Sequence, residues 1–152
     1  MVVTTYDRRR EMHAAAERLY DRSWSVGQIK ATVAKITGSS RSLLCLADVE
    51  DEPVRIEKLE QQAIDIDRIR GTQGRSDRFD IDFHPVNRRS RPRWVSVATG
   101  ITEDVLQMPP VEVVEVDGVY YVHDGQHRVS AAKALGKTTI DANVTRWHMD
   151  EA

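Results

Sequence analysis

The alternation of hydrophobic and polar positions is most regular in the last third of the chain. Val111, Val113 and Val116 lead into Asp117-Gly118, a dipeptide favoured in two-residue hairpin turns. Residues 119–123 are therefore expected to return as the partner strand.

A helix and a last strand are predicted after this hairpin. Val129, Ala132 and Leu135 recur at helical spacing, and Gly136 is a typical residue to end the helix. Residues 140–145 then alternate apolar and polar, which indicates a strand.

The first third shows helical periodicity. It predicts one helix over Thr5–Arg22 and a second that begins at Ser25 as N-cap and ends at Gly38. The pair could be a helical hairpin or a helix-turn-helix. The apolar positions of the second helix are Ile29, Val33 and Ile36.

The middle of the chain is less regular. Short helices are expected over 41–49 and over 54–62, the latter with Ile56 and Leu59 inward. A strand is expected over 63–69, followed by a loop over 71–76. Three further segments complete it: a short extended piece over 79–83, an exposed loop over 85–92, and 93–105, which is ambiguous between helix and strand.

These elements predict an α+β fold with a small mixed sheet and packed helices. Residues 1–62 would be a helical lead that packs on the core or dimerises beside it, and residues 63–148 would be the compact α+β domain.

Composition narrows the class of protein. The 152 residues carry a formal net charge of −2, so no global basic field draws the chain to nucleic acid. No apolar run is long enough to span a membrane and no signal peptide is visible, so a cytoplasmic location is expected. Cys45 stands alone, which excludes an internal disulfide.

The strongest candidate chemistry is Asp124-Gly125-Gln126-His127-Arg128, where the hairpin strand runs into the helix. Helix N-termini attract anions because their first N–H groups lack intrahelical partners. Arg128 offers a fork for phosphate oxygens and His127 could donate to phosphate or act as an acid. Asp124 could cap the helix, hold a metal or act as a base.

A second group of candidates follows the strand expected over 63–69. Arg75, beside Gly71 and Gly74, is a further candidate anion contact. Asp77, Asp80 and Asp82 are candidate Mg²⁺ ligands or a general base. The alternating pattern alone would make Asp80 and Asp82 outward-facing positions of an extended segment.

The stretch Tyr121–Gly136 resembles the signature of the ParB/sulfiredoxin superfamily, in which a strand enters a Gly-x-x-Arg turn and a helix that holds nucleotide phosphate. Residues 74–83 with Arg93-Trp94 are similar to a bacterial ParB-like subgroup labelled ParB-like nucleases. The resemblance implies a bound nucleotide (CTP or ATP) with Mg²⁺, and hydrolysis or transfer of a phosphoryl group. The implied nucleotide contacts are Arg75, Gly125, Gln126, His127, Arg128 and Ser130.

Two departures from the family pattern limit what is expected. Gln126 stands where sulfiredoxins place their reactive cysteine, so sulfinic-acid reduction is not expected. Gln126 and His127 also replace the Glu-Arg pair of the CTP-hydrolysing partition proteins, which leaves the nucleotide open.

Two other functions remain open from the residues. In one, the chain binds or cleaves nucleic acid through a basic loop that contains Arg88, Arg89, Arg91 and Arg93. In the other, the chain is a non-catalytic interaction module and its N-terminal helices form a homodimer.

Overall fold

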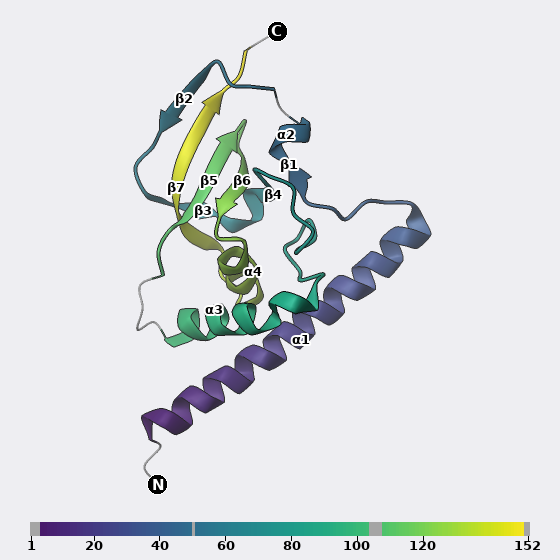
Figure 1. The fold of residues 1–152 in the computed structure, drawn as a ribbon, viewed down its shortest axis with the longest axis vertical. Helices are drawn as coiled ribbons and strands as arrows, with labels where there is room; N and C mark the ends of the chain where they lie inside the picture. Colours follow the sequence, from purple (N-terminus) through teal and green to yellow (C-terminus); the bar gives the residue numbers. More distant parts are fainter. Residues whose placement is uncertain (1–3, 50, 104–107, 151–152) are drawn as a thin grey trace.

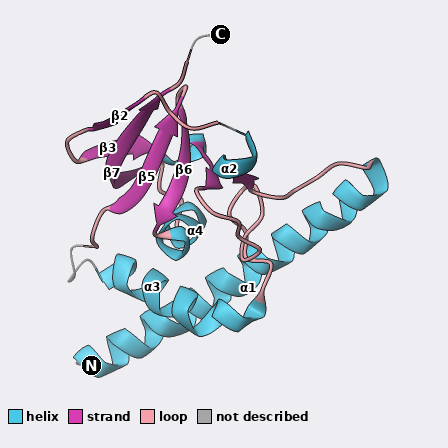
Figure 2. Cartoon of the chain, turned by 45° about the horizontal axis from the view of Figure 1, so that its top comes forward, coloured by secondary structure: helices cyan, strands magenta, loops and turns pink. Residues whose placement is uncertain are grey.

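The computed structural model describes residues 4–49, 51–103 and 108–150, so Val105, at the end of the ambiguous 93–105 segment, lies outside the described residues. The described part forms one mixed sheet with its three longest helices on one side (Figures 1 and 2). Its helices and strands are α1 Thr5–Thr37, β1 Leu44–Cys45, α2 Leu46–Val49, β2 Arg55–Lys58, β3 Gln62–Asp65, β4 Ile69–Thr72, α3 Arg91–Glu103, β5 Val111–Val116, β6 Val119–Asp124, α4 Gln126–Ala134 and β7 Thr139–His148. Short 3₁₀ turns occupy Ile66–Arg68 and Arg88–Ser90.

The sheet confirms the predicted α+β class with a mixed sheet and an N-terminal helix. Its strand order is β1-β4-β6-β5-β7-β2, and β3 also pairs with β7. β5 is antiparallel to β6 and parallel to β7, while β4 is parallel to β6. β1 and β2 precede residue 62, so strands from the expected N-terminal lead join the same sheet as strands from residues 63–148.

The last third folds as the pattern predicts. Asp117 and Gly118 have φ angles of 49° and 80°, the left-handed values that a tight hairpin turn requires. α4 follows β6, and Gly136 adopts a left-handed φ of 80° just after it. β7 then runs along β5.

The prediction of two N-terminal helices is wrong, because α1 is one continuous helix. Thr4 caps its start and Gly38, with φ 72°, caps its end. Ser25 is not an N-cap. Gly27 does not break the helix; a Cβ there would lie 2.8 Å from the His84 Cβ, so this glycine permits close packing instead.

The middle segments differ most from prediction. The helix expected over 54–62 is instead β2 and the start of β3, and Ile56 is exposed rather than inward. The segment 41–49 is helical only in α2. Residues 91–103 form helix α3, so the loop expected over 85–92 gives way to a 3₁₀ turn and a helix start.

The main core lies between the sheet and the helices. Its largest buried side chains include Tyr20 from α1 and Trp94 from α3, whose rings meet edge to face with centroids 5.4 Å apart. Val113 and Val122 contribute from the sheet and Val129 from α4. A smaller cluster of Leu46, Val114, Val116 and Tyr121 covers the other face.

None of the helices in the described part of the chain has a stretch apolar enough to cross a membrane, although α1 is long.

Candidate anion-binding cleft

The turn between β6 and α4 leaves backbone N–H groups open. Gly125 is the N-cap of α4 with φ 114°, and a Cβ there would lie 2.6 Å from Val111 Cγ1. The N–H of Val129 bonds to the carbonyl of Gly125, so the preceding amides of α4 have no intrahelical acceptor. No described side chain forms a capping hydrogen bond to this helix start. The turn therefore has the backbone of an anion site.

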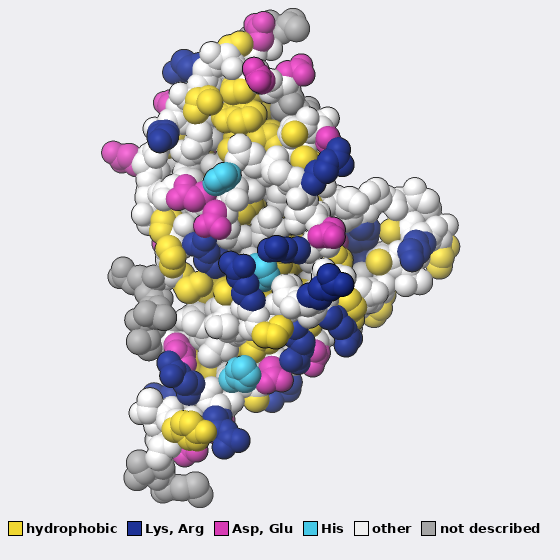
Figure 3. Space-filling view, viewed as in Figure 1, with side chains coloured by type: hydrophobic (Ala, Val, Ile, Leu, Met, Phe, Trp, Pro, Cys, Tyr) yellow, Lys and Arg dark blue, Asp and Glu magenta, His cyan; other side chains and the backbone are white. Residues whose placement is uncertain are grey.

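This helix start opens onto a cleft of about 500 Å³. Its positively charged lining comes from Arg78 in the loop after β4, Arg93 on α3 and Arg128 on α4. The turn adds His123, Asp124, Gln126 and His127, of which Asp124 carries a negative charge. Figure 3 shows Lys and Arg side chains gathered across the middle of this face of the molecule.

Arg78 and Arg93 are the unpaired cations of the cleft. Both are exposed, and neither guanidinium group forms a hydrogen bond or ion pair with a residue that the structure describes, although the backbone of Arg78 is hydrogen-bonded. Some other arginines of the fold are paired: Arg41, Arg91 and Arg146 each meet a carboxylate within 3.4 Å. Positive charge at the cleft is thus left for an external anion to neutralise.

His127 also lines the cleft, and its imidazole ring is uncharged. Its side chain is only 5% exposed, and its ring stands edge-on to Phe79 at 5.2 Å. Nε2 is shielded from solvent and has no partner among the described residues. Burial, reinforced by the charges of Arg93 and Arg78, lowers the pKa of His127 from 6.5 to about 4. The ring is therefore uncharged at pH 7 and holds a single N–H to donate.

Arg128 is engaged within the protein. Its Nη1 donates to the carbonyl oxygens of Pro109 and Pro110 at 2.5 and 3.1 Å, and its Nη2 donates to Asp124 Oδ2 at 3.0 Å. The guanidinium clasps the segment before β5 onto the helix start, and Asp124 serves this clasp. Only the remaining N–H groups of Arg128 are left for a ligand.

Arg128→Lys should destabilise the fold by about 1–2 kcal/mol, because an ammonium cannot span three acceptors placed for a planar fork. Urea unfolding followed by circular dichroism measures the change. Arg75→Lys, at an exposed arginine with one ion pair, is the control and should leave stability unchanged. Equal stability of Arg128→Lys and the wild type would contradict the clasp.

Two other predicted nucleotide contacts have structural roles. Gln126 Oε1 accepts from Ser76 Oγ at 2.7 Å, which ties the loop after β4 to the turn. Ser130 is buried, where it accepts from Trp94 Nε1 at 2.8 Å and donates to the carbonyl of Phe83 at 2.6 Å. Ser130 therefore joins α3, α4 and the 79–83 turn and is not placed at the cleft.

Arg75, Asp77 and Asp80 lie elsewhere. Arg75 is 82% exposed and pairs with Asp48 at 2.9 Å, so it does not line the cleft. Asp77 and Asp80 border a different hollow, between α1 and the 76–86 loop. In the described ranges, no three His, Cys, Asp or Glu side chains are grouped to hold a metal ion.

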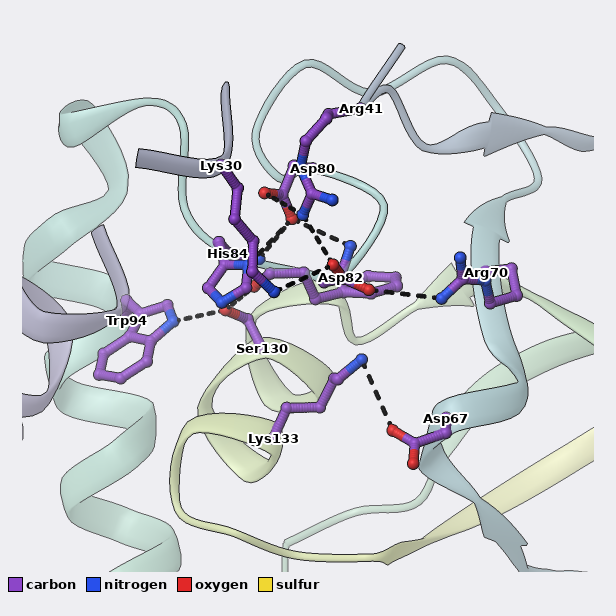
Figure 4. A network of polar contacts seen from close by, with 11 residues as sticks. Lys30, Arg41, Asp67, Arg70, Asp80, Asp82, His84, Trp94, Ser130 and Lys133 are labelled. Carbon is purple, nitrogen blue, oxygen red and sulfur yellow. Dashed lines mark hydrogen bonds and ion pairs between the residues drawn. The ribbon is translucent and has the colours of Figure 1, made fainter. Parts of the chain in front are cut away.

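Asp80 is a buried structural carboxylate (Figure 4), which corrects the expectation that it faces outward. Oδ1 accepts the backbone N–H groups of Asp82 and His84 at 3.0 and 2.9 Å, and Oδ2 accepts Arg41 at 3.1 Å. Burial raises the pKa of Asp80, but the hydrogen bonds from His84 and Arg41 outweigh it and hold this pKa below its usual value. The carboxylate therefore anchors the 79–84 turn.

The basic loop does not form one surface. The Arg88 guanidinium lies over Trp24 at 4.7 Å, and Arg91 pairs with Glu17 of α1. Arg93 instead lines the cleft, and Arg89 is exposed. The four arginines predicted to contact nucleic acid are thus divided between α1, the cleft and solvent.

Sequence reasoning did not name Arg78 as a site residue, and it named Arg93 only as a contact for nucleic acid, whereas both line the cleft. For Arg93 the neighbouring Trp94 was a local signal. A tryptophan is usually buried, so the adjacent position on a helix points in a different direction from the core. Arg78 carried no such signal, because its place depends on how the loop after β4 folds over the turn.

The chain was compared with family models, curated proteins and solved structures. No family model matches the chain, and neither does any curated protein. Among solved structures, sulfiredoxin from Arabidopsis thaliana is similar with 23% sequence identity and a TM-score of 0.40, over 57% of this chain and 84% of that one.

Proposed function

We propose that the chain belongs to the ParB/sulfiredoxin superfamily and binds the phosphate groups of a nucleotide in the cleft at the start of α4. The observation that carries the proposal is the pair Arg78 and Arg93, unpaired with any described residue, beside the open N–H groups that follow Gly125. Two guanidinium groups and a helix N-terminus offer the fixed positive field that phosphate oxygens need.

An adjoining hollow supports a ligand larger than phosphate. It measures about 750 Å³ and shares Met108, Pro109 and Arg128 with the cleft. Ile101 and Ile140 give it apolar walls. Pockets of this size accommodate small organic ligands, so a nucleoside could occupy the hollow while its phosphates reach the arginines.

The proposed chemistry is hydrolysis or transfer of a phosphoryl group of CTP or ATP. Arg78 and Arg93 would stabilise charge on the phosphates. Neutral His127 would donate one hydrogen bond or accept a proton, in place of the acid role expected from the sequence. Mg²⁺ would enter with the triphosphate, since this ion retains waters and phosphate oxygens as ligands.

Calorimetric titration of CTP, ATP, GTP and ADP, each with Mg²⁺, tests the proposal. Arg78→Ala and Arg93→Ala should each weaken binding about 10-fold, in line with loss of a charged hydrogen bond. Arg89→Ala, an exposed arginine outside the cleft, is the matched control and should bind as the wild type does. Absence of binding to every nucleotide, or equal affinity in all variants, would refute it.

A further inference from the structure

The outward face of α1 carries a row of apolar side chains. Val26, Ile29, Val33 and Ile36, called the α1 seam below, follow one another at spacings of three, four and three residues. That is the spacing of the a and d positions of a coiled coil. Ile29, Val33 and Ile36 are 65%, 53% and 81% exposed.

The seam is a second apolar face of the helix. The face that packs on the body consists of Ala16, Tyr20, Gly27 and Ala34. A helix that covers a domain is expected to be polar on its other side. Large β-branched side chains that recur there in register indicate a surface that another element covers.

The position of α1 leaves the seam accessible. In Figures 1 and 2 the C-terminal part of α1 extends past the sheet, away from α3 and α4. The residues that hold this part to the body lie on the opposite side: Gly27 packs against His84, and Ala34 is buried. The seam therefore faces outward along the projecting part of the helix.

We infer that the α1 seam pairs with the α1 seam of a second copy of the chain, antiparallel, with Ile29 of one copy against Val33 of the other. The flanking positions favour an identical partner over a charged foreign helix. Ser25 and Thr32 are uncharged, and Lys30 is 3.6 Å from Asp82 of its own chain. A charged foreign helix would therefore find no complementary charges beside the seam, whereas a second copy of the seam offers matching apolar side chains.

Charge selects the antiparallel arrangement. Arg22 precedes Val26 by four residues and continues the seam toward the N-terminus. In a parallel pair, Arg22 would face Arg22 of the second copy and the two charges would repel. In the antiparallel register, Arg22 lies beyond the end of the second helix, which stops at Thr37.

Sedimentation velocity of the full chain over roughly 1 to 500 μM tests the pairing, a range set by the weak affinity of a short interface. The wild type should form a reversible dimer. Ile29→Glu should raise the dimer dissociation constant at least about 100-fold, because two carboxylates enter the seam of a symmetric dimer. Ile56→Glu, at an equally exposed isoleucine on β2, is the control and should dimerise normally. A monomeric wild type, or an Ile29→Glu chain that dimerises normally, would overturn the inference.

Cysteine cross-linking in a Cys45→Ala background tests the orientation. Chains with Ile29→Cys should cross-link to chains with Val33→Cys when the two are mixed, several-fold more than either does alone. Preferential cross-linking of Ile29→Cys with itself would indicate parallel pairing and overturn the antiparallel arrangement. The nucleotide titration is unaffected by either result, so the two proposals fail separately.

Discussion

Gly71→Ala should destabilise the protein by about 3 kcal/mol, because it overpacks a backbone contact that cannot yield. A Cβ at Gly71 would lie 2.4 Å from the carbonyl oxygen of Leu44 and 2.8 Å from Tyr121 Cδ1. Leu44 is the register partner of Gly71 in the parallel β1–β4 pairing. The added methyl group would therefore push β1 off the edge of the sheet.

Gly74→Ala provides the matched control, since a Cβ at that glycine meets nothing within 4 Å among the described residues. The two glycines looked equivalent in the sequence, as parts of one loop that faces a ligand. Guanidinium unfolding of both variants separates them: Gly74→Ala should match the wild type. A Gly71→Ala chain as stable as Gly74→Ala would mean that β1 does not pack on β4 as described.

Acidification should destabilise the protein through His127. Its pKa is lowered from 6.5 to about 4 in the folded state. Between these two pH values His127 is protonated in the unfolded chain but not in the folded chain, so the free energy of unfolding decreases as the pH falls. The stabilisation is complete above pH 6.5 and is lost by about pH 4. A shift of this size corresponds to at most about 3 kcal/mol, and screening by solvent at the cleft reduces it.

His127→Gln should flatten this part of the stability profile, measured by urea unfolding at intervals from pH 7.5 to 4. His123→Gln, at an exposed histidine of the same turn, is the matched control. Carboxyl groups also titrate in this pH range, so the informative quantity is the difference in slope between the two variants. Identical slopes would show that His127 is not held neutral by burial.

Local signals in the sequence determined the elements of the last third. Asp117-Gly118 specifies a hairpin turn, and Gly125 and Gly136 stand where left-handed backbone is needed at the two ends of α4. These features depend on the φ and ψ preferences of a few neighbouring residues, so they are readable without the fold. The predicted α+β class rests on the same local patterns.

Long-range packing decided the elements that the sequence misassigned. The sequence predicted a helix start at Ser25, yet α1 continues through it, and Gly27 packs closely against His84 in the body of the protein. Residues 54–62 have helical spacing, yet β2 forms because β7 offers it an edge. Local propensity is weak beside the hydrogen bonds and burial that a neighbouring element supplies.

The candidate anion-binding cleft also has features set by local sequence and features set by long-range packing. The sequence by itself determined that Gly125 and its neighbours form an open helix start, because the turn is encoded within five residues. Only the tertiary structure decided which side chains serve it: Arg128 turns to Pro109 and Pro110, whereas Arg78 and Arg93 come to the cleft. Asp80 is likewise drawn into the interior by Arg41. The partner of a charged side chain depends on segments far away in the chain, and no local pattern records it.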